Sequence, residues 1–310
     1  MGAPVETREG QTVAGTSLAA RYASFVKLPH TLFALPFAGV GVVLASFASA
    51  ARITPLLAFW VVLAFTAARF AAMGFNRIVD RHYDALNPRT ARRELPGGRL
   101  TVAQAAVAVA VSAAVFVYAA WQLNPLCGRL APLALLWVFF YSYTKRFTAW
   151  SHHVLGLALG IAPAGGYLAV TGAWPAPWFA LPVLSAAVMF WVAGFDVIYA
   201  IQDVDFDRAQ GLHSIPARVG ARRALMRARL FHVVAWLLFA TLAVLRLFPV
   251  GPIFAIGLLG MAGLLVYEHR VIGDATPDKL DLPRLDRAFF RANVGVSTSL
   301  FVFTLLDRLV

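Results

Sequence analysis

The sequence contains a single cysteine, Cys127, among its 310 residues. One cysteine excludes an intramolecular disulfide and any metal cluster that is built from several thiolates. Charged residues are also scarce, because they make up only 14% of the chain, whereas soluble proteins contain about a quarter. The first ~15 residues lack the apolar core of a secretory signal peptide. The sequence therefore predicts neither a disulfide-stabilised secreted domain nor an ordinary soluble enzyme.

Acidic residues are few relative to basic ones, 15 against 27, and the formal net charge is +12. Such an excess occurs in nucleic-acid-binding proteins, but it also marks the cytoplasmic loops of membrane proteins. Hydrophobic residues make up 60% of the chain and the mean hydropathy is +0.72. This composition favours a polytopic membrane protein. We therefore expect a lipid bilayer as a partner and no nucleic acid.

Apolar runs recur along the chain, each close to the ~20 residues that a helix needs to cross a hydrocarbon core of about 30 Å. Nine such runs lie near residues 30–51, 55–78, 102–122, 126–143, 152–172, 177–200, 229–248, 252–268 and 289–307. They predict an all-α membrane protein with nine transmembrane helices.

Two domains are expected from the same pattern. Residues 1–28 are predicted to form a tail that ends in an amphipathic helix, near 16–27, on the membrane surface. Residues 29–310 are predicted to form one transmembrane domain.

Basic residues are unequally divided between the two sides that nine spans define. One side has 22 of the 27 Lys and Arg residues, and the other has only Arg52, Arg129, Arg246 and Arg308. Because positive charge collects in cytoplasmic loops, the richer side is predicted to be cytoplasmic, and the N-terminus lies on it.

The first polar motif follows an apolar run and contains Asn76, Asp80 and Asp84. On a helix, residues spaced by four share one face. Two like charges one turn apart repel each other, and a divalent cation would offset this repulsion. The motif therefore indicates a metal site rather than a solvated helix end.

A second carboxylate motif, with Asp196, Asp203 and Asp207, follows another apolar run more than 100 residues later. The charge count places both motifs on the same membrane face, so we expect them to form one site. Ionisable groups at membrane depth usually serve a function, and oxygen ligands suit Mg²⁺ or Mn²⁺. Five basic residues could bind phosphate oxygens nearby: Arg81, Arg89, Arg93, Lys145 and Arg146. The histidines at 82, 152 and 153 are too scattered for a metal centre.

Three motifs resemble signatures of the UbiA superfamily of membrane prenyltransferases. The first is Asn76-x-x-x-Asp80-x-x-x-Asp84, followed by Asn87-Pro88-Arg89-Thr90 and Arg93. The second is Tyr141-x-x-x-Lys145-Arg146, and the third is Asp196-x-x-Tyr199-Ala200-x-x-Asp203-x-x-x-Asp207. The resemblance covers about residues 20–305 and implies a helical bundle around a central cavity that opens near the cytoplasmic face.

The resemblance implies that two Mg²⁺ ions bridge the diphosphate of a polyprenyl diphosphate, held by four ligands: Asp80, Asp84, Asp203 and Asp207. It also implies catalytic roles for Lys145 and Tyr141, which would stabilise the leaving diphosphate, and for Asp196, which would position the acceptor or its proton. Substrate-binding roles are implied for six residues: Arg69, Asn76, Arg89, Arg93, Arg146 and Tyr199.

The acceptor implied by the resemblance is an aromatic acid, 4-hydroxybenzoate or 1,4-dihydroxy-6-naphthoate, used in ubiquinone or menaquinone synthesis in a bacterial inner membrane. Arg69 lies seven residues before Asn76, on the same helix face, and would bind the acceptor carboxylate. Glu94 stands where the family commonly has proline. This departure adds a carboxylate beside the expected diphosphate region and favours the naphthoate.

Aromatic residues at helical spacing usually serve packing, but four of them are candidates to line the apolar trough for the isoprenoid tail: Phe139, Phe140, Tyr167 and Trp191. A membrane transporter and a CDP-alcohol phosphotransferase remain alternatives. A transporter would be expected to place its charges at the midplane of broken, inverted repeats. The phosphotransferase would need its aspartates in one contiguous motif.

Overall fold

The computed structural model describes residues 17–48, 52–273 and 291–310. Within these ranges the chain forms helices and connecting segments, without a β-strand. The longer helices are α1 (Leu18–Phe25), α2 (Leu28–Ala48), α3 (Pro55–Leu86), α4 (Val102–Leu123), α5 (Pro125–Thr144), α6 (Ser151–Thr171), α7 (Ala180–Tyr199), α10 (Ala221–Val244), α11 (Pro252–Ile272) and α13 (Asn293–Leu309). Three short helices lie between α7 and α10: η2 (Ala200–Asp203), α8 (Val204–Ala209) and α9 (Ile215–Val219).

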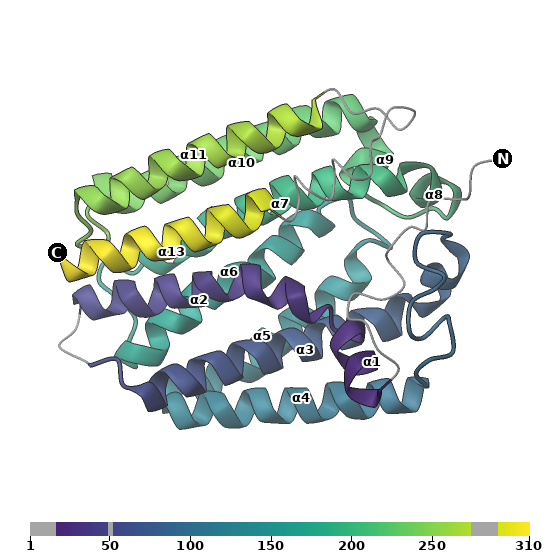
Figure 1. The fold of residues 1–310 in the computed structure, drawn as a ribbon, viewed down its shortest axis with the longest axis horizontal. Coiled ribbons are helices and arrows are strands. Elements are labelled where there is room, and N and C mark those ends of the chain that lie inside the picture. The colour runs from purple at the N-terminus through teal and green to yellow at the C-terminus, as the bar shows by residue number, and fades with distance from the viewer. Residues whose placement is uncertain (1–16, 49–51, 274–290) are drawn as a thin grey trace.

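The long helices lie side by side and alternate in direction along the chain (Figure 1). Helices α8 and α9 and the loop between α3 and α4 lie at one end of the bundle, and the C-terminus lies at the opposite end (Figure 1). The two carboxylate motifs therefore lie at the same end, as the charge count predicted.

Seven of the described helices are long and apolar enough to cross a membrane. They correspond to the second through eighth predicted spans, from α3 to α11. Helices α2 and α13 occupy the positions of the first and last predicted spans. The protein is thus an all-helical integral membrane protein, and the count of nine transmembrane helices stays a prediction.

Local signals explain where the helices begin. Thr54, Thr101 and Asn124 each accept a hydrogen bond from a backbone N–H of the first turn of the following helix. Thr101 forms a reciprocal capping box with Gln104. Proline follows directly at the first position of α3 and α5, where its missing N–H costs no helical hydrogen bond. These caps fix the residues at which α3, α4 and α5 begin.

The bundle has a packed half and a hollow half. Helices α2, α6, α7, α10, α11 and α13 contact one another in a closed ring. This ring surrounds an apolar core in which Phe37, Trp191 and Phe239 are fully buried. Helices α2 to α6 instead enclose a cavity, which is described with the site below.

Small residues allow α6 to approach α7 closely. A Cβ atom on Gly156 would collide with the backbone carbonyl of Met189, and one on Gly160 with that of Ser185. The Gly-x-x-x-Gly spacing thus serves helix packing within this chain.

Candidate active site

The first carboxylate motif lies near the end of α3, a continuous helix of 32 residues. Asn76 donates a hydrogen bond from Nδ2 to Asp80 Oδ2 at 2.9 Å, across one helical turn. This bond orients Asp80 and confirms that the two side chains share a face. Asp84 follows one turn later, and its side chain is 9% exposed.

The second motif lies where the chain passes from α7 through a 3₁₀ turn into α8. Helix α7 ends at Tyr199, η2 covers residues 200–203, and α8 begins at Val204. Asp203 therefore ends the 3₁₀ turn, and Asp207 lies one turn into α8. The side chain of Asp207 is fully buried, and that of Asp203 is 10% exposed.

The α3–α4 loop (residues 87–101) joins the two motifs. Asn87 is the C-cap of α3 and donates from Nδ2 to Asp203 Oδ1 at 3.0 Å. Arg89 binds both oxygens of the same carboxylate, Nε to Oδ1 at 3.0 Å and Nη2 to Oδ2 at 2.6 Å. Arg89 also donates from Nη1 to the hydroxyl of Tyr199 at 3.2 Å. The first motif is thus tied to the second by the residues that immediately follow it.

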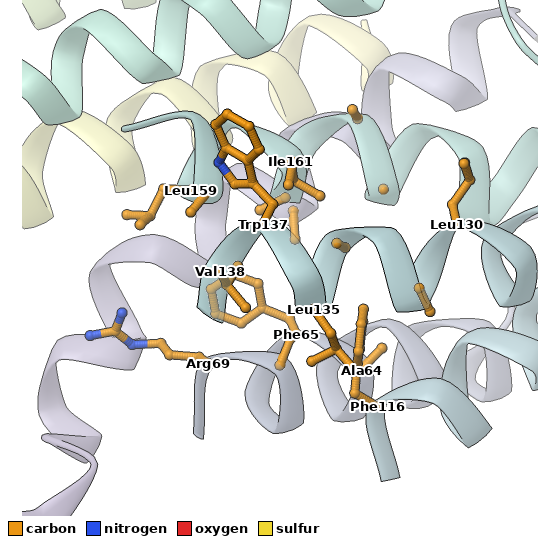
Figure 2. A pocket seen from close by; sticks show the side chains of 18 of the residues that line it. Ala64, Phe65, Arg69, Phe116, Leu130, Leu135, Trp137, Val138, Leu159 and Ile161 are labelled. Atoms are coloured by element: carbon orange, nitrogen blue, oxygen red, sulfur yellow. The ribbon is translucent and has the colours of Figure 1, made fainter. Parts of the chain in front are cut away.

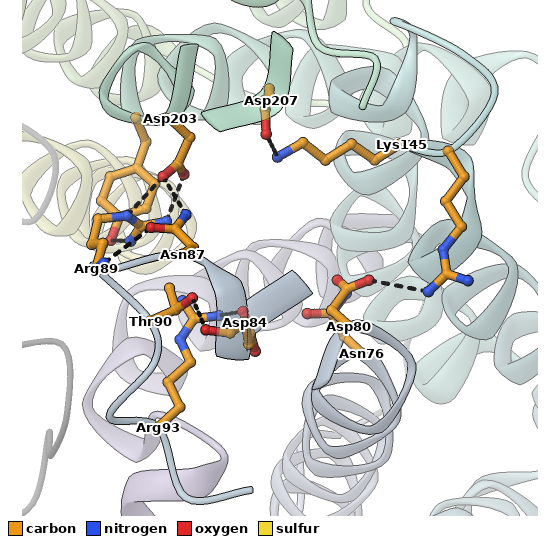
Figure 3. Close-up of polar contacts among 12 residues, drawn as sticks. Asn76, Asp80, Asp84, Asn87, Arg89, Thr90, Arg93, Lys145, Asp203 and Asp207 are labelled. Carbon is orange, nitrogen blue, oxygen red and sulfur yellow. Dashed lines mark hydrogen bonds and ion pairs between the residues drawn. The ribbon is translucent and has the colours of Figure 1, made fainter. Parts of the chain in front are cut away.

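Each of the four aspartates is paired with a different cation. Four ion pairs result: Arg146–Asp80 at 3.6 Å, Arg93–Asp84 at 2.7 Å, Arg89–Asp203 at 2.6 Å and Lys145–Asp207 at 2.7 Å. Figure 3 shows the labelled aspartates around a common centre, with Lys145 reaching to Asp207 across the upper part of the view. Lys145 also acts electrostatically on Asp80 and Asp203. The four predicted metal ligands therefore pair with four of the five predicted phosphate-binding cations. The fifth, Arg81, instead donates from Nη1 to the carbonyl of Ile78 at 3.0 Å.

The residues fit a hard divalent cation that is shared with a phosphate. All four carboxylates supply oxygen donors, and Oδ1 of the buried Asp207 lies 2.7 Å from Lys145 Nζ. Within those residues, no three His, Cys, Asp or Glu side chains are close enough to hold a metal by themselves. Mg²⁺ commonly binds through one or two carboxylates and completes its shell with water and substrate phosphates. This donor set matches that behaviour.

A cavity of about 510 Å³ extends from the polar site into the bundle, and residues of the helices α2, α3, α4, α5 and α6 line it. Arg69, Asn76 and Tyr141 are among its polar lining residues, and apolar side chains dominate the rest. Figure 2 shows Arg69 extending from α3 beside labelled apolar side chains, among them Phe65 and Val138. Because Asn76 both lines the cavity and binds Asp80, the cavity adjoins the carboxylate site.

Asp196 lies apart from the four paired aspartates. Its Oδ2 lies 2.7 Å from Nδ1 of the buried His152 on α6, and its side chain is 24% exposed. The charges of Asp196 and Asp80 both act on the Tyr141 hydroxyl, which lines the cavity. Asp196 therefore lies close to the polar end of the cavity but is not one of the four aspartates in the ion pairs above.

The expectation about Glu94 was wrong. Glu94 is only 2% exposed, and its Oε1 accepts a hydrogen bond from Ser24 and pairs with Arg99. Its carboxylate thus holds α1 against the α3–α4 loop instead of extending the diphosphate region, which removes the reason to favour the naphthoate.

The four aromatic candidates do not line the cavity, which agrees with the usual packing role of aromatic residues at helical spacing. Tyr167 and Trp191 are buried in the packed half, and Phe139 stacks on Phe75 with ring centroids 4.3 Å apart. The described aromatic lining consists of Phe65, Phe116, Trp137, Tyr141 and Trp174.

Sequence reasoning also missed the contacts of two residues. Asn87 was part of a recognised motif, but only the folded loop shows that it binds Asp203. His152 was considered only as a metal ligand, and its bond to Asp196 joins positions 44 residues apart. No spacing rule connects α6 to α7 at that residue.

The model of the UbiA prenyltransferase family matches residues 34–294. The chain belongs to this family. It is therefore a prenyltransferase, an enzyme that transfers alkyl groups larger than methyl, and the transporter and CDP-alcohol phosphotransferase alternatives were wrong.

Individual relatives agree with this assignment of a UbiA prenyltransferase. A 4-hydroxybenzoate octaprenyltransferase of Nitrosospira multiformis is 31% identical over 260 residues, which are 84% of each chain. A polyprenyl transferase of Arthrobotrys oligospora is 33% identical over 171 residues, which cover 54% of this chain and 46% of that protein.

Solved UbiA structures share the fold. The apo structure of a UbiA homologue from Aeropyrum pernix K1 is 32% identical, with a TM-score of 0.78 over 90% of this chain and 98% of that one. A UbiA homologue from Archaeoglobus fulgidus bound to DMAPP and Mg²⁺ is 18% identical, with a TM-score of 0.70 over 94% and 99% of the two chains.

Proposed function

We propose that this UbiA prenyltransferase transfers a polyprenyl group from a polyprenyl diphosphate to an aromatic carboxylic acid, with Mg²⁺ as cofactor. The observation that carries the proposal is the position of the four aspartate–cation pairs beside the polar end of a long apolar cavity. The polar site suits a metal diphosphate, and the cavity suits an isoprenoid chain. The UbiA homologue from Archaeoglobus fulgidus is described as bound to DMAPP and Mg²⁺, which supports a prenyl diphosphate and Mg²⁺ as ligands here.

The metal would be held by Asp80, Asp84, Asp203 and Asp207, as two ions, and would neutralise charge on the diphosphate as a Lewis acid. Asn76 would fix the first pair through its bond to Asp80.

The cations of the site have a distinct task. Lys145, Arg89, Arg93 and Arg146 would bind diphosphate oxygens and stabilise the negative charge that grows as the substrate C–O bond breaks. Tyr199 would keep Arg89 in place through the hydroxyl that accepts its Nη1–H. Tyr141, which lines the cavity and is acted on by the charges of Asp80 and Asp196, would assist Lys145 in stabilising the leaving diphosphate.

The reaction is an electrophilic aromatic substitution. The electron pair of the C–O bond leaves with the diphosphate, and a carbon of the aromatic ring supplies the pair for the new C–C bond. The proton that this ring carbon loses passes to the released diphosphate. The apolar cavity wall keeps water away from the cationic prenyl carbon in the transition state.

The acceptor would be oriented by two residues. Arg69 lies in an otherwise largely apolar lining and would bind the acceptor carboxylate, for which a guanidinium is the best-matched partner. Asp196 would accept a hydrogen bond from the acceptor hydroxyl, which enriches the ring in electrons. The relative named 4-hydroxybenzoate octaprenyltransferase supports 4-hydroxybenzoate as the acceptor, and 1,4-dihydroxy-6-naphthoate satisfies the same two contacts.

We further propose nine membrane spans, with α2 and α13 added to the seven apolar helices, and a position of α1 on the membrane surface. The rest of the predicted tail, residues 1–16, lies outside the described residues. The carboxylate site and the N-terminus would face the cytoplasm at a bacterial inner membrane.

Purified protein tests the function directly. With Mg²⁺ and a long-chain polyprenyl diphosphate, we expect prenylated product from 4-hydroxybenzoate or from 1,4-dihydroxy-6-naphthoate when each is offered separately. Removal of Mg²⁺ by a chelator should stop the reaction, and added Mg²⁺ should restore it. Product from neither acceptor, or transfer that persists without divalent metal, would contradict the proposal.

A further inference from the structure

His152 occupies the first turn of α6 and is only 3% exposed. Its two ring nitrogens contact two other parts of the chain. Nδ1 lies 2.7 Å from Asp196 Oδ2 on α7, and Nε2 lies 3.3 Å from the backbone nitrogen of Ile215 at the start of α9. One buried side chain thus joins three helices that meet at the polar end of the bundle.

These contacts determine the tautomer of the ring. The backbone N–H of Ile215 can only donate, so Nε2 must carry a lone pair and accept. A neutral imidazole with a free Nε2 carries its hydrogen on Nδ1. Nδ1 therefore donates to the Asp196 carboxylate, and the 2.7 Å distance is typical of a hydrogen bond to a charged acceptor.

The contact leaves part of the Asp196 carboxylate accessible. His152 binds Oδ2, and the Asp196 side chain as a whole is 24% exposed, so it is only partly covered by its neighbours. Tyr141 lines the cavity, and the negative charge of Asp196 acts on its hydroxyl group.

The segment that binds Nε2 also borders the diphosphate side. His213 donates its backbone N–H to the carbonyl of Lys145 at 2.7 Å, and Ser214 caps α9 by accepting from the N–H of Ala217. Ile215, the next residue, provides the N–H that fixes the ring of His152. The segment His213–Ile215 therefore contacts Lys145 directly and Asp196 through His152.

We propose that His152 is a positioning residue for the acceptor. Its Nδ1–H holds Asp196 so that Oδ1 faces the acceptor hydroxyl, and the bond from Ile215 keeps the ring in the tautomer that can do this. The proposal rests on the proposed function, because it assigns His152 to the acceptor half of that reaction.

The neighbouring His153 provides a matched control. Its ring packs against Trp150, Phe190 and Phe231, with centroid distances of 4.9, 5.7 and 4.7 Å. Neither ring nitrogen forms a hydrogen bond within the described residues. His153 thus behaves as an aromatic packing residue. His153→Phe should preserve both Michaelis constants of the transferase.

Two conservative variants separate the two bonds of His152. In His152→Asn the amide nitrogen takes the place of Nδ1 and can still donate to Asp196. In His152→Gln the amide oxygen reaches the place of Nε2 and can accept from Ile215, but the donor to Asp196 is lost. We expect His152→Asn to keep the acceptor KM within about 3-fold, and His152→Gln to raise it by ~10-fold or more, since a charged hydrogen bond is lost. The KM of the polyprenyl diphosphate should change in neither variant.

A double-variant cycle tests whether His152 acts through Asp196. In an Asp196→Ala background, His152→Gln should cause no further rise in the acceptor KM. Additive effects, equal losses in the Asn and Gln variants, or a change confined to the diphosphate KM would overturn the positioning role. These outcomes require a wild-type protein that prenylates one of the two acceptors. A wild type active on neither would overturn the proposed function, and the role of His152 with it.

Discussion

The two carboxylate motifs look alike in sequence but differ in backbone structure. In both, an apolar run is followed by aspartates four residues apart. Asp80 and Asp84 lie on one uninterrupted helix, whereas Asp203 and Asp207 lie on either side of a change from 3₁₀ to α geometry. The first pair is thus aligned by helix periodicity, and the second by its partners Arg89, Asn87 and Lys145.

Exposure differs between Asp80 and Asp207, whereas Asp84 and Asp203 are covered alike, at 9% and 10% exposed. The side chain of Asp80 is 32% exposed, and that of Asp207 is completely buried. A rigid helix can present a carboxylate to solvent without further support. A carboxylate on a short, broken segment needs contacts from other elements to keep one orientation, and those contacts bury it. Asp80 and Asp207 thus have equivalent places in the sequence pattern but differ in burial, and we expect Asp207 to tolerate substitution less well.

Removal of one carboxylate from either motif should have the largest effect. Asp80→Ala and Asp203→Ala should each lower kcat by at least about 10²-fold, because charge on the leaving diphosphate is no longer neutralised. Steady-state kinetics at saturating Mg²⁺ measures this loss. Asp205→Ala is the matched control, since Asp205 is exposed on the same segment, and it should keep near-normal rates. Near-normal turnover in Asp80→Ala or Asp203→Ala would mean that the two motifs do not form one site.

Arg69→Ala should affect the other substrate. Loss of a charged hydrogen-bond partner costs about 1.5–3 kcal/mol, so we expect the acceptor KM to rise by roughly 10–100-fold. The KM of the diphosphate substrate should stay the same. An effect restricted to the diphosphate would remove Arg69 from the acceptor site.

Lengthening the carboxylates sharpens the comparison of the two motifs. Asp207→Glu adds a methylene group to a fully buried side chain. Overpacking of this kind lowers the free energy of unfolding by about 1–3 kcal/mol. Asp80→Glu adds the same group at a third-exposed position and should cost less. We expect a larger fall in both the melting temperature and kcat/KM for Asp207→Glu. Equal effects of the two substitutions would show that backbone context does not distinguish the motifs.

Much of this architecture could be predicted from the sequence. The length and spacing of the apolar runs predicted the helices from α3 to α11, and the uneven distribution of Lys and Arg placed both motifs at one end. Helix periodicity alone also predicted that Asn76 faces Asp80, because those residues lie on an unbroken helix.

Long-range contacts could not be predicted in this way. The pairing of Arg89 with Asp203 and of His152 with Asp196 depends on how the α3–α4 loop and α6 pack against α7. Glu94 was misplaced for the same reason, since its partner Ser24 is 70 residues away. Charge and spacing predicted which residues gather at the polar end of the bundle, but packing determines the partner of each one.

The smallest effect is expected at Glu94. Glu94→Gln should lower the melting temperature by a few degrees, because a buried hydrogen-bonded carboxylate is replaced by an amide. Both Michaelis constants should remain within about 2-fold of wild type. A marked rise in the diphosphate KM would return Glu94 to the substrate site.

The central claim is that the two motifs form a single metal–diphosphate site, and binding measurements test it most directly. Calorimetric titration of a prenyl S-thiolodiphosphate, which resists cleavage, would compare the wild type with Asp80→Asn and Asp203→Asn, with and without Mg²⁺. We predict that Mg²⁺ strengthens binding to the wild type by about 10-fold or more, and that each single variant loses this enhancement. A variant of either motif that retains the full Mg²⁺ enhancement would contradict the claim.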